Sequence, residues 1–252
     1  MKTLTFALSL IRHGETQYNK DGLLQSFTSG LQQAEAAGCY LKDVECSNVF
    51  SSNMLRAQQT VQTIMKHNRS CSGLQLVCDP LLKEKSFGIA EGRLVQDVRE
   101  MAEAAGQSFP GFTPPKGETQ EQVWRWRPVA VEGGLSSCLS VISSIMQTSS
   151  SSNPLSTSPA EGRADEGVRG FPVHALVITH GAHMCMAVRF LVEELGCSLP
   201  PGSDKEHVFA LSPNTGLSRF LLTVRRAEGR FALSAIRCVF VHRKGGAFKS
   251  RS

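Results

Sequence analysis

The stretch TFALSLIRHGET at positions 5–16 decides the fold class, because a short apolar run passes directly into a polar turn. Residues 5–11 predict a buried strand of a mostly parallel sheet, since such strands are apolar on both faces. A second run of this kind, ALVIT at positions 175–179, ends in His180 just as the first ends in His13. Two strands of the predicted sheet therefore end in the same manner, although they lie far apart in the chain.

Helix-forming and strand-forming stretches alternate along the rest of the chain. This alternation predicts an α/β fold, a three-layer sandwich in which a mostly parallel central sheet is flanked by helices on both faces. The expected helices are 30–41, 53–66, 94–105, 184–195 and one from residue 121 onward, and the other expected strands are 49–52, 74–77, 217–224 and 232–241. The polar tail from residue 242 is expected to fray.

The length and composition indicate one globular domain. The 252 residues are 41% hydrophobic and 19% charged, which is enough apolar material for a sizeable core. Between residues 147 and 170 the composition changes abruptly to serine and other small or polar residues. We therefore expect residues 1–252 to form a single domain, with a flexible Ser-rich insertion at about 147–170.

Charge and cysteine usage exclude several classes of partner. The net charge of +5 is mild, and no run of lysine or arginine predicts a nucleic-acid partner. The eight cysteines are scattered, without a Cys-x-x-Cys pair or zinc-ligand spacing, so reduced thiols are expected. No stretch approaches the roughly 20 apolar residues of a membrane span. These features favour a cytoplasmic protein without a metal or other cofactor, and they leave protein partners unknown.

The two histidines are the main reason to expect a functional site. Ligands of an α/β sheet bind beyond the carboxyl ends of the strands, so His13 and His180 are expected to meet at one edge. A neutral imidazole is a competent nucleophile towards phosphorus. Phosphoryl transfer also needs positive charge around the phosphoryl oxygens, which Arg12 and Arg56 could supply through their planar guanidinium groups. The nearby arginines should also keep His13 neutral at pH 7.

Metal chemistry is not favoured by the pattern. His183 follows His180 by three residues, a spacing that can suit a metal, but no third ligand is evident. We therefore expect His183 to be non-ligating and the chemistry to be independent of metal.

Four motifs in order give the chain a resemblance to a known family. RHGET at 12–16, SSNMLRAQQT at 51–60, LKEKSFGIAEG at 82–92 and THG at 179–181 resemble the motifs of the histidine phosphatase (phosphoglycerate mutase-like) superfamily. Further segments resemble the TIGAR-type fructose-2,6-bisphosphatases of that superfamily. They are FTPPKGET at 112–119, CSLP at 197–200, SPNTG at 212–216 and the low-complexity insertion.

The resemblance implies a role for each motif residue. His13 would become the phosphohistidine, and Glu84 would protonate the leaving alkoxide and then activate water. Composition alone would equally allow Glu15 or Glu91, so the family motif selects Glu84. A bound phosphate should raise the pKa of Glu84. The implied phosphoryl-binding residues are Arg12, Asn19, Arg56 and His180.

The implied substrate is fructose 2,6-bisphosphate, whose hydrolysis would lower glycolytic flux. Fructose 1,6-bisphosphate and bisphosphoglycerate remain open as substrates. Phosphoglycerate mutase activity and a low-turnover metabolite-binding scaffold remain open as other functions. Family members also occur in the nucleus and the mitochondrion, so these locations are expected besides the cytoplasm.

The chain departs from the family pattern after its first motif. The loop between Gln25 and Gly30 is several residues shorter than in the family and lacks the usual Asp-x-Pro-Leu portion. In relatives this loop forms part of the substrate rim, and Ser26, Thr28 or Ser29 could substitute for its hydroxyl. Lys83 stands where the family commonly has arginine. Substrate selectivity is therefore less defined by the sequence than the histidine chemistry.

Overall fold

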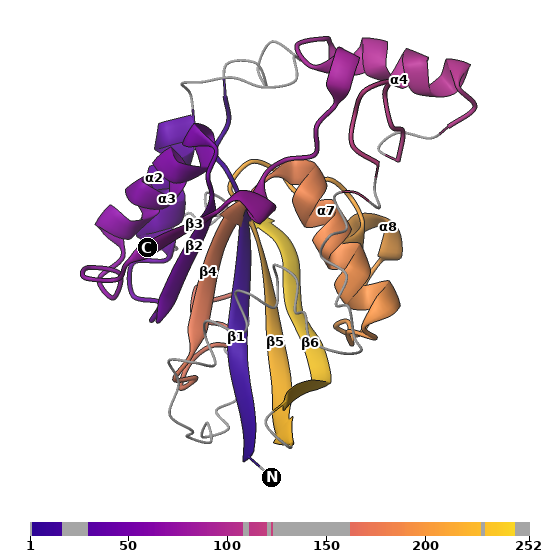
Figure 1. Cartoon of the computed structure of the whole chain (residues 1–252). Coiled ribbons are helices and arrows are strands. Elements are labelled where there is room, and N and C mark those ends of the chain that lie inside the picture. Colours follow the sequence, from indigo (N-terminus) through magenta and orange to yellow (C-terminus); the bar gives the residue numbers. More distant parts are fainter. Residues whose placement is uncertain are drawn as a thin grey trace.

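The computed structural model describes residues 2–16, 30–107, 111–119, 122, 162–227 and 230–244. Within these residues six strands form one sheet in the order β3-β2-β4-β1-β5-β6 (Figure 1). The strands are β1 (Lys2–Arg12), β2 (Asn48–Ser52), β3 (Leu76–Asp79), β4 (His174–Thr179), β5 (Gly216–Ala227) and β6 (Arg230–Lys244).

The sheet has a parallel part and an antiparallel edge. Strand β4 lies between β1 and β2 and is parallel to both, and β3 adds a further parallel strand. All six residues of β4 are buried, as expected for an apolar strand covered on both faces. Strands β5 and β6 form an antiparallel pair, and β5 is also antiparallel to β1. The predicted α/β fold class is confirmed, and its sheet is mixed.

Helices cover both faces of this sheet (Figure 1). The pair α2 (Gly30–Tyr40) and α3 (Leu55–His67) lies on one side, and α7 (Gly181–Arg189) and α8 (Lys205–Val208) lie on the other. Helix α4 (Val95–Ala104) stands beyond the sheet edge at which β1 ends. The short turns η1 (Pro80–Leu82) and η2 (Gly88–Ala90) lead towards α4, and the π-helical turn η3 (Phe190–Glu194) extends α7.

Most predicted elements lie within a few residues of the observed ones. The helix predicted at 184–195 differs, because it begins three residues earlier as α7 and ends as a π-helical turn. Strand β6 continues to Lys244, beyond the point at which fraying was expected. The helix predicted from residue 121 lies outside the described residues, apart from residue 122. No helix among the described residues is long and apolar enough to cross a membrane.

The sheet packs against two apolar clusters, one on each face, and a third, smaller cluster lies around α4. On β1, Leu8 and Leu10 join the cluster beneath α7, whereas Ala7 and Ile11 join the cluster beneath α2 and α3. This alternation follows from the two-residue period of a strand. Each fully buried leucine or isoleucine contributes about 1.5–3 kcal/mol, so burial on both faces holds β1 firmly in the centre.

A buried arginine ties the chain before β4 to the sheet. Arg219 on β5 has no exposed surface, and its Nε donates a hydrogen bond to Ser9 Oγ at 2.9 Å. Its Nη1 donates to the carbonyl oxygens of Ala164 at 2.7 Å and Glu166 at 2.8 Å. The carboxylate of Glu166 also pairs with Arg243 at 2.8 Å. Residues 162–170, the last part of the predicted insertion, are therefore packed structure, and residues 147–161 lie outside the described part.

Candidate active site

The ends of β1 and β4 bring two histidines side by side. Arg12 pairs with Thr179 in the parallel ladder, and the backbone N–H of His13 donates to the Thr179 carbonyl at 2.9 Å. His13 and His180, the next residues of the two strands, have ring centroids 5.1 Å apart with the planes at 62°. Both side chains are buried. The structure therefore brings together the two histidines that the sequence placed at one sheet edge.

Arg56 joins the two imidazole rings. It lies in the first turn of α3, close to the carboxyl end of β2. Its Nε lies 3.2 Å from Nε2 of His13 and 3.2 Å from Nδ1 of His180. A guanidinium group can only donate hydrogen bonds, so both histidine nitrogens accept. Arg56, His13 and His180 therefore converge on one point, where an oxygen atom of a ligand could contact all three side chains.

The backbone fixes the orientation of the His13 ring. Nδ1 lies 2.7 Å from the carbonyl oxygen of Gly14, so Nδ1 carries the proton and donates it. Nε2 therefore carries the lone pair of the ring, which accepts the hydrogen bond from Arg56. The pKa of His13 is lowered to about 3, first by burial and then by Arg56 and Arg12. The expected neutral state follows from the structure, although burial contributes more than the arginines from which it was predicted.

A close backbone approach supports this turn. A Cβ atom on Gly14 would lie 2.5 Å from the carbonyl oxygen of Gly30 at the start of α2. The N–H of Gly14 donates to Thr60 Oγ1 at 3.0 Å, and the same hydroxyl donates to the Arg56 carbonyl at 2.8 Å. Thr60 thus links the turn that carries His13 to α3, which carries Arg56.

Arg12 presents an available donor to the site. Its Nη1 donates to the Ser212 carbonyl at 2.6 Å, which anchors the guanidinium group. Its buried Nε has no hydrogen-bond partner among the described residues. The Cβ that a larger residue would add at Gly181 would lie 3.1 Å from Arg12 Cζ, so glycine leaves room for the guanidinium. An anion at this edge of the sheet would find an oriented N–H group.

Glu84 lies at the N-terminus of α7. Its carboxylate accepts hydrogen bonds from the backbone N–H groups of Lys85 at 3.0 Å, His183 at 3.2 Å and Ala182 at 3.3 Å. A helix N-terminus favours the charged form of a carboxylate. Burial nevertheless raises the pKa of Glu84, and it outweighs the opposing backbone hydrogen bonds and the charges of Arg56 and Arg12. This carboxyl group therefore holds its proton more readily than an exposed glutamate.

The segment that carries Glu84 is clamped to residues 111–118. The backbone N–H of Ser86 donates to the Glu118 carboxylate at 2.9 Å, and Lys85 Nζ donates to the Phe112 carbonyl at 2.9 Å. Lys83 forms an ion pair with Glu118 at 2.9 Å. The half-exposed ion pair contributes little, typically about 0–1 kcal/mol, so the buried backbone contacts hold the clamp.

The remaining sequence-predicted residues fall in three places. Asn19 and the loop from Gln25 to Ser29 lie outside the described residues. Glu15 accepts a hydrogen bond from Gln33 at 3.3 Å, and Glu91 accepts one from Ser86 at 2.9 Å. Glu84, by contrast, accepts hydrogen bonds from the N-terminus of α7.

His183 makes a structural contact. Its Nδ1 lies 3.1 Å from the Lys83 carbonyl, and burial lowers its pKa to about 4. The described residues contain no group of three or more histidine, cysteine or acidic side chains placed to hold a metal ion.

One contact of His180 was not anticipated from the sequence. Its Nε2 lies 2.9 Å from the hydroxyl of Ser52, the last residue of β2. The same reasoning about strand ends that selected the histidines applies to Ser52, since β2 ends beside β4. The position of Ser52 at the end of a predicted strand was therefore visible in the sequence, but serine is too common at strand ends for this position to indicate a functional residue.

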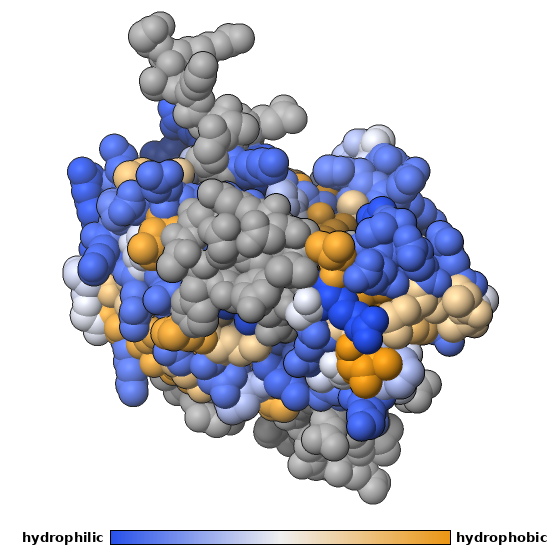
Figure 2. Space-filling view, turned by 90° about the horizontal axis from the view of Figure 1, so that it is seen from above, coloured by the Kyte–Doolittle hydropathy of each residue, from blue (hydrophilic) through white to orange (hydrophobic). Residues whose placement is uncertain are grey.

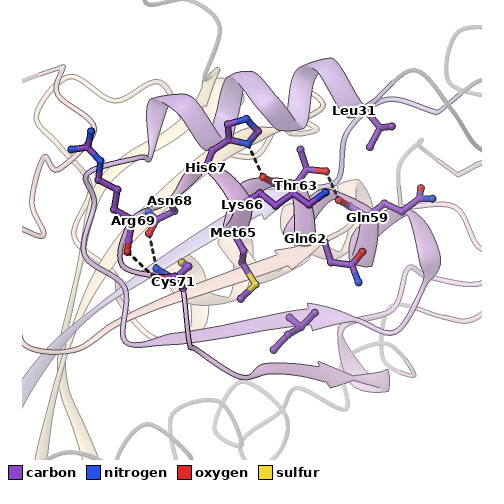
Figure 3. Close-up of a pocket in the computed structure, with 12 residues that line it drawn as sticks. Leu31, Gln59, Gln62, Thr63, Met65, Lys66, His67, Asn68, Arg69 and Cys71 are labelled. Atoms are coloured by element: carbon purple, nitrogen blue, oxygen red, sulfur yellow. Dashed lines mark hydrogen bonds between the residues drawn. The ribbon is translucent and has the colours of Figure 1, made fainter.

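Two hollows lie near α3. A cavity of about 60 Å³ is lined by Arg56, Gly14 and Thr60, and so adjoins the histidine cluster. A larger hollow of about 980 Å³ follows the side of α3, where Gln62, Met65 and Lys66 line it (Figure 3). Neither hollow has His13 or His180 among its lining residues, but the smaller one is lined by Arg56, which contacts both rings. Seen from the end of the sheet at which β1 and β4 end, the described surface is mostly hydrophilic with scattered apolar patches (Figure 2).

Comparison with known proteins identifies the family of the chain. The family model of the histidine phosphatase superfamily (branch 1) matches residues 8–130. A Danio rerio protein named probable fructose-2,6-bisphosphatase TIGAR A is 47% identical, over 96% of this chain and 97% of its own length. The fructose-2,6-bisphosphatase TIGAR of Xenopus tropicalis is 36% identical, over 94% of both chains.

The fold also has solved counterparts. A phosphoglycerate mutase from Bacillus anthracis superposes with a TM-score of 0.58 at 18% identity, over 92% of this chain and 93% of that chain. The chain therefore belongs to the histidine phosphatase superfamily, and within it resembles the TIGAR-type proteins over almost its whole length.

Proposed function

We propose that this protein hydrolyses a phosphate ester of a sugar bisphosphate through a phosphohistidine at His13. The observation that carries the proposal is the contact of Arg56 Nε with Nε2 of His13 and Nδ1 of His180. It aims the lone pair of a neutral imidazole at the point where a guanidinium group would bind phosphoryl oxygens. A histidine kept neutral by burial is nucleophilic throughout the physiological pH range.

The reaction has two steps with one acid–base residue. In the first, His13 Nε2 attacks phosphorus, the ester bond breaks, and protonated Glu84 gives its proton to the leaving alkoxide. In the second, the Glu84 carboxylate takes a proton from water, whose oxygen attacks the phosphohistidine and releases inorganic phosphate. Arg12 and Arg56 balance the charge of the phosphoryl oxygens in both steps. The raised pKa of Glu84 suits the first step, which needs the protonated acid.

Fructose 2,6-bisphosphate is the proposed substrate. The support is that the relatives from Danio rerio and Xenopus tropicalis carry this activity in their names and match nearly the whole chain. Fructose 1,6-bisphosphate and bisphosphoglycerate are the alternatives. Removal of fructose 2,6-bisphosphate would lower glycolytic flux, and action in the cytoplasm, nucleus and mitochondrion is proposed from the family resemblance alone.

The test is a panel of phosphate esters with wild type and the His13→Ala variant. We expect phosphate release from fructose 2,6-bisphosphate by wild type only, and a phosphorylated peptide containing His13 after rapid quenching and mass spectrometry. Equal release by both proteins would contradict the nucleophile and favour the binding scaffold. Conversion of 3-phosphoglycerate into its isomer, without free phosphate, would instead identify a mutase.

A further inference from the structure

A buried hydroxyl holds the second histidine of the site. Ser52 has no exposed surface, and its Oγ lies 2.9 Å from Nε2 of His180. The same oxygen accepts a hydrogen bond from the backbone N–H of Met54 at 3.2 Å. Met54 is the N-cap residue of α3, and Arg56 lies two residues further on. One hydroxyl therefore connects the end of β2, the start of α3 and the His180 ring.

The contacts of His180 define its tautomer. Nδ1 accepts a hydrogen bond from Arg56, which can only donate, so Nδ1 carries no proton. Burial, followed by the charges of His13 and Arg56, holds the pKa of His180 well below its usual value. A neutral ring with a bare Nδ1 carries its proton on Nε2, which must donate it to Ser52. Ser52 is thus the acceptor that this tautomer requires.

We propose that Ser52 is a positioning residue for the reaction, because it fixes Nδ1 as the His180 nitrogen that faces the phosphoryl group. The inference rests on the proposed function for its catalytic meaning. An imidazole ring can turn about its Cβ–Cγ bond into a second orientation, which would exchange a nitrogen for a carbon at the ligand side. The hydrogen bond to Ser52 selects one orientation. Loss of the hydroxyl leaves a buried N–H without an acceptor and removes that preference.

The neighbouring serine offers a matched control. Ser51 lies on the same strand and is equally buried, but its Oγ donates to the Ser52 carbonyl at 3.0 Å. Successive residues of a strand point to opposite faces, so the Ser51 side chain lies on the other side of β2. Ser51→Ala and Ser52→Ala therefore each remove one buried hydroxyl from β2, and only the second removes the partner of His180.

The experiment measures turnover, phosphate binding and the His180 tautomer. We expect Ser52→Ala to lower kcat/KM and the affinity for inorganic phosphate by about tenfold to a hundredfold, while Ser51→Ala stays near wild type. Long-range proton–nitrogen NMR of the free wild-type protein should show His180 protonated at Nε2, and Ser52→Ala should lose this single tautomer. Thermal melting of both variants separates positioning from a general loss of stability.

Either of two results would overturn the inference. One is a free wild-type protein in which His180 is protonated at Nδ1, and the other is equal kinetics and phosphate affinity for Ser51→Ala and Ser52→Ala. The NMR measurement needs no turnover. An inactive wild-type protein with the expected tautomer would therefore refute the proposed function, whereas an active one with the opposite tautomer would refute the role of Ser52.

Discussion

Replacing Arg56 by lysine keeps a positive charge but removes a donor where His13 and His180 meet. Along the side chain, the position of arginine Nε corresponds to the Cε methylene of lysine. The two contacts of 3.2 Å from Nε would therefore be made by a carbon that cannot donate a hydrogen bond. A hydrogen bond involving a charged group contributes about 1.5–3 kcal/mol, which corresponds to a loss of about tenfold to more than a hundredfold in rate.

The assay is kcat/KM for phosphate release from fructose 2,6-bisphosphate, with Arg69→Lys as the control. Arg69 follows the end of α3 and forms an exposed ion pair with Asp43 at 2.6 Å, a kind of contact that contributes little. We expect Arg69→Lys to behave as wild type and Arg56→Lys to lose activity with an unchanged melting temperature. Activity of Arg56→Lys within about a factor of two of wild type would show that charge alone suffices and would refute the bridging role.

Three further changes test the acid, the backbone approach and the buried histidines. Because the proposed first step needs protonated Glu84, kcat/KM should decline as pH rises through the raised pKa of this residue. Glu84→Gln should abolish the decline, and a decline that persists in the variant would exclude Glu84 as the acid. Gly14→Ala would place a Cβ 2.5 Å from the Gly30 carbonyl and should lower the free energy of unfolding by about 1–3 kcal/mol in urea, so an unchanged midpoint contradicts the packing. His174, with its pKa lowered to about 3 chiefly by burial, protonates below pH 6.5 only when unfolded. Proton uptake by the unfolded chain therefore lowers the free energy of unfolding by about 1.4 kcal/mol per pH unit as pH falls from 6.5 towards 3. His174→Gln should lose less stability than wild type between pH 7 and 5, and equal losses in the two proteins would contradict this role of His174.

The sequence predicted the parallel half of the fold because its signal is local. The apolar runs that became β1 and β4 define buried strands, and parallel strands end at one edge, which places His13 beside His180. The antiparallel direction of β5 and β6 could not be predicted in this way, because apolar content indicates burial and not strand direction. Arg219 is a similar case, since a charged residue within a strand suggests exposure, yet three acceptors allow it to be fully buried.

The sequence predicted that His13 and His180 would lie together, but it could not predict the contacts around them. The motifs identified Arg56 and Glu84 without showing that one joins two rings or that the other lies at the α7 N-terminus. The same holds for Ser52, whose contact depends on the pairing of β2 with β4. Hydrogen-bond partners far apart in the chain are a tertiary property, so only the folded structure identifies them.

The buried guanidinium of Arg219 fixes the place at which the chain enters the strand that precedes His180. Because it holds the carbonyls of residues 164 and 166, the chain enters β4 from a fixed point on the sheet. The position of β4 is thus set from two sides, by the Arg219 contacts just before the strand and by its pairing with β1, and the distance between the His13 and His180 rings depends on both.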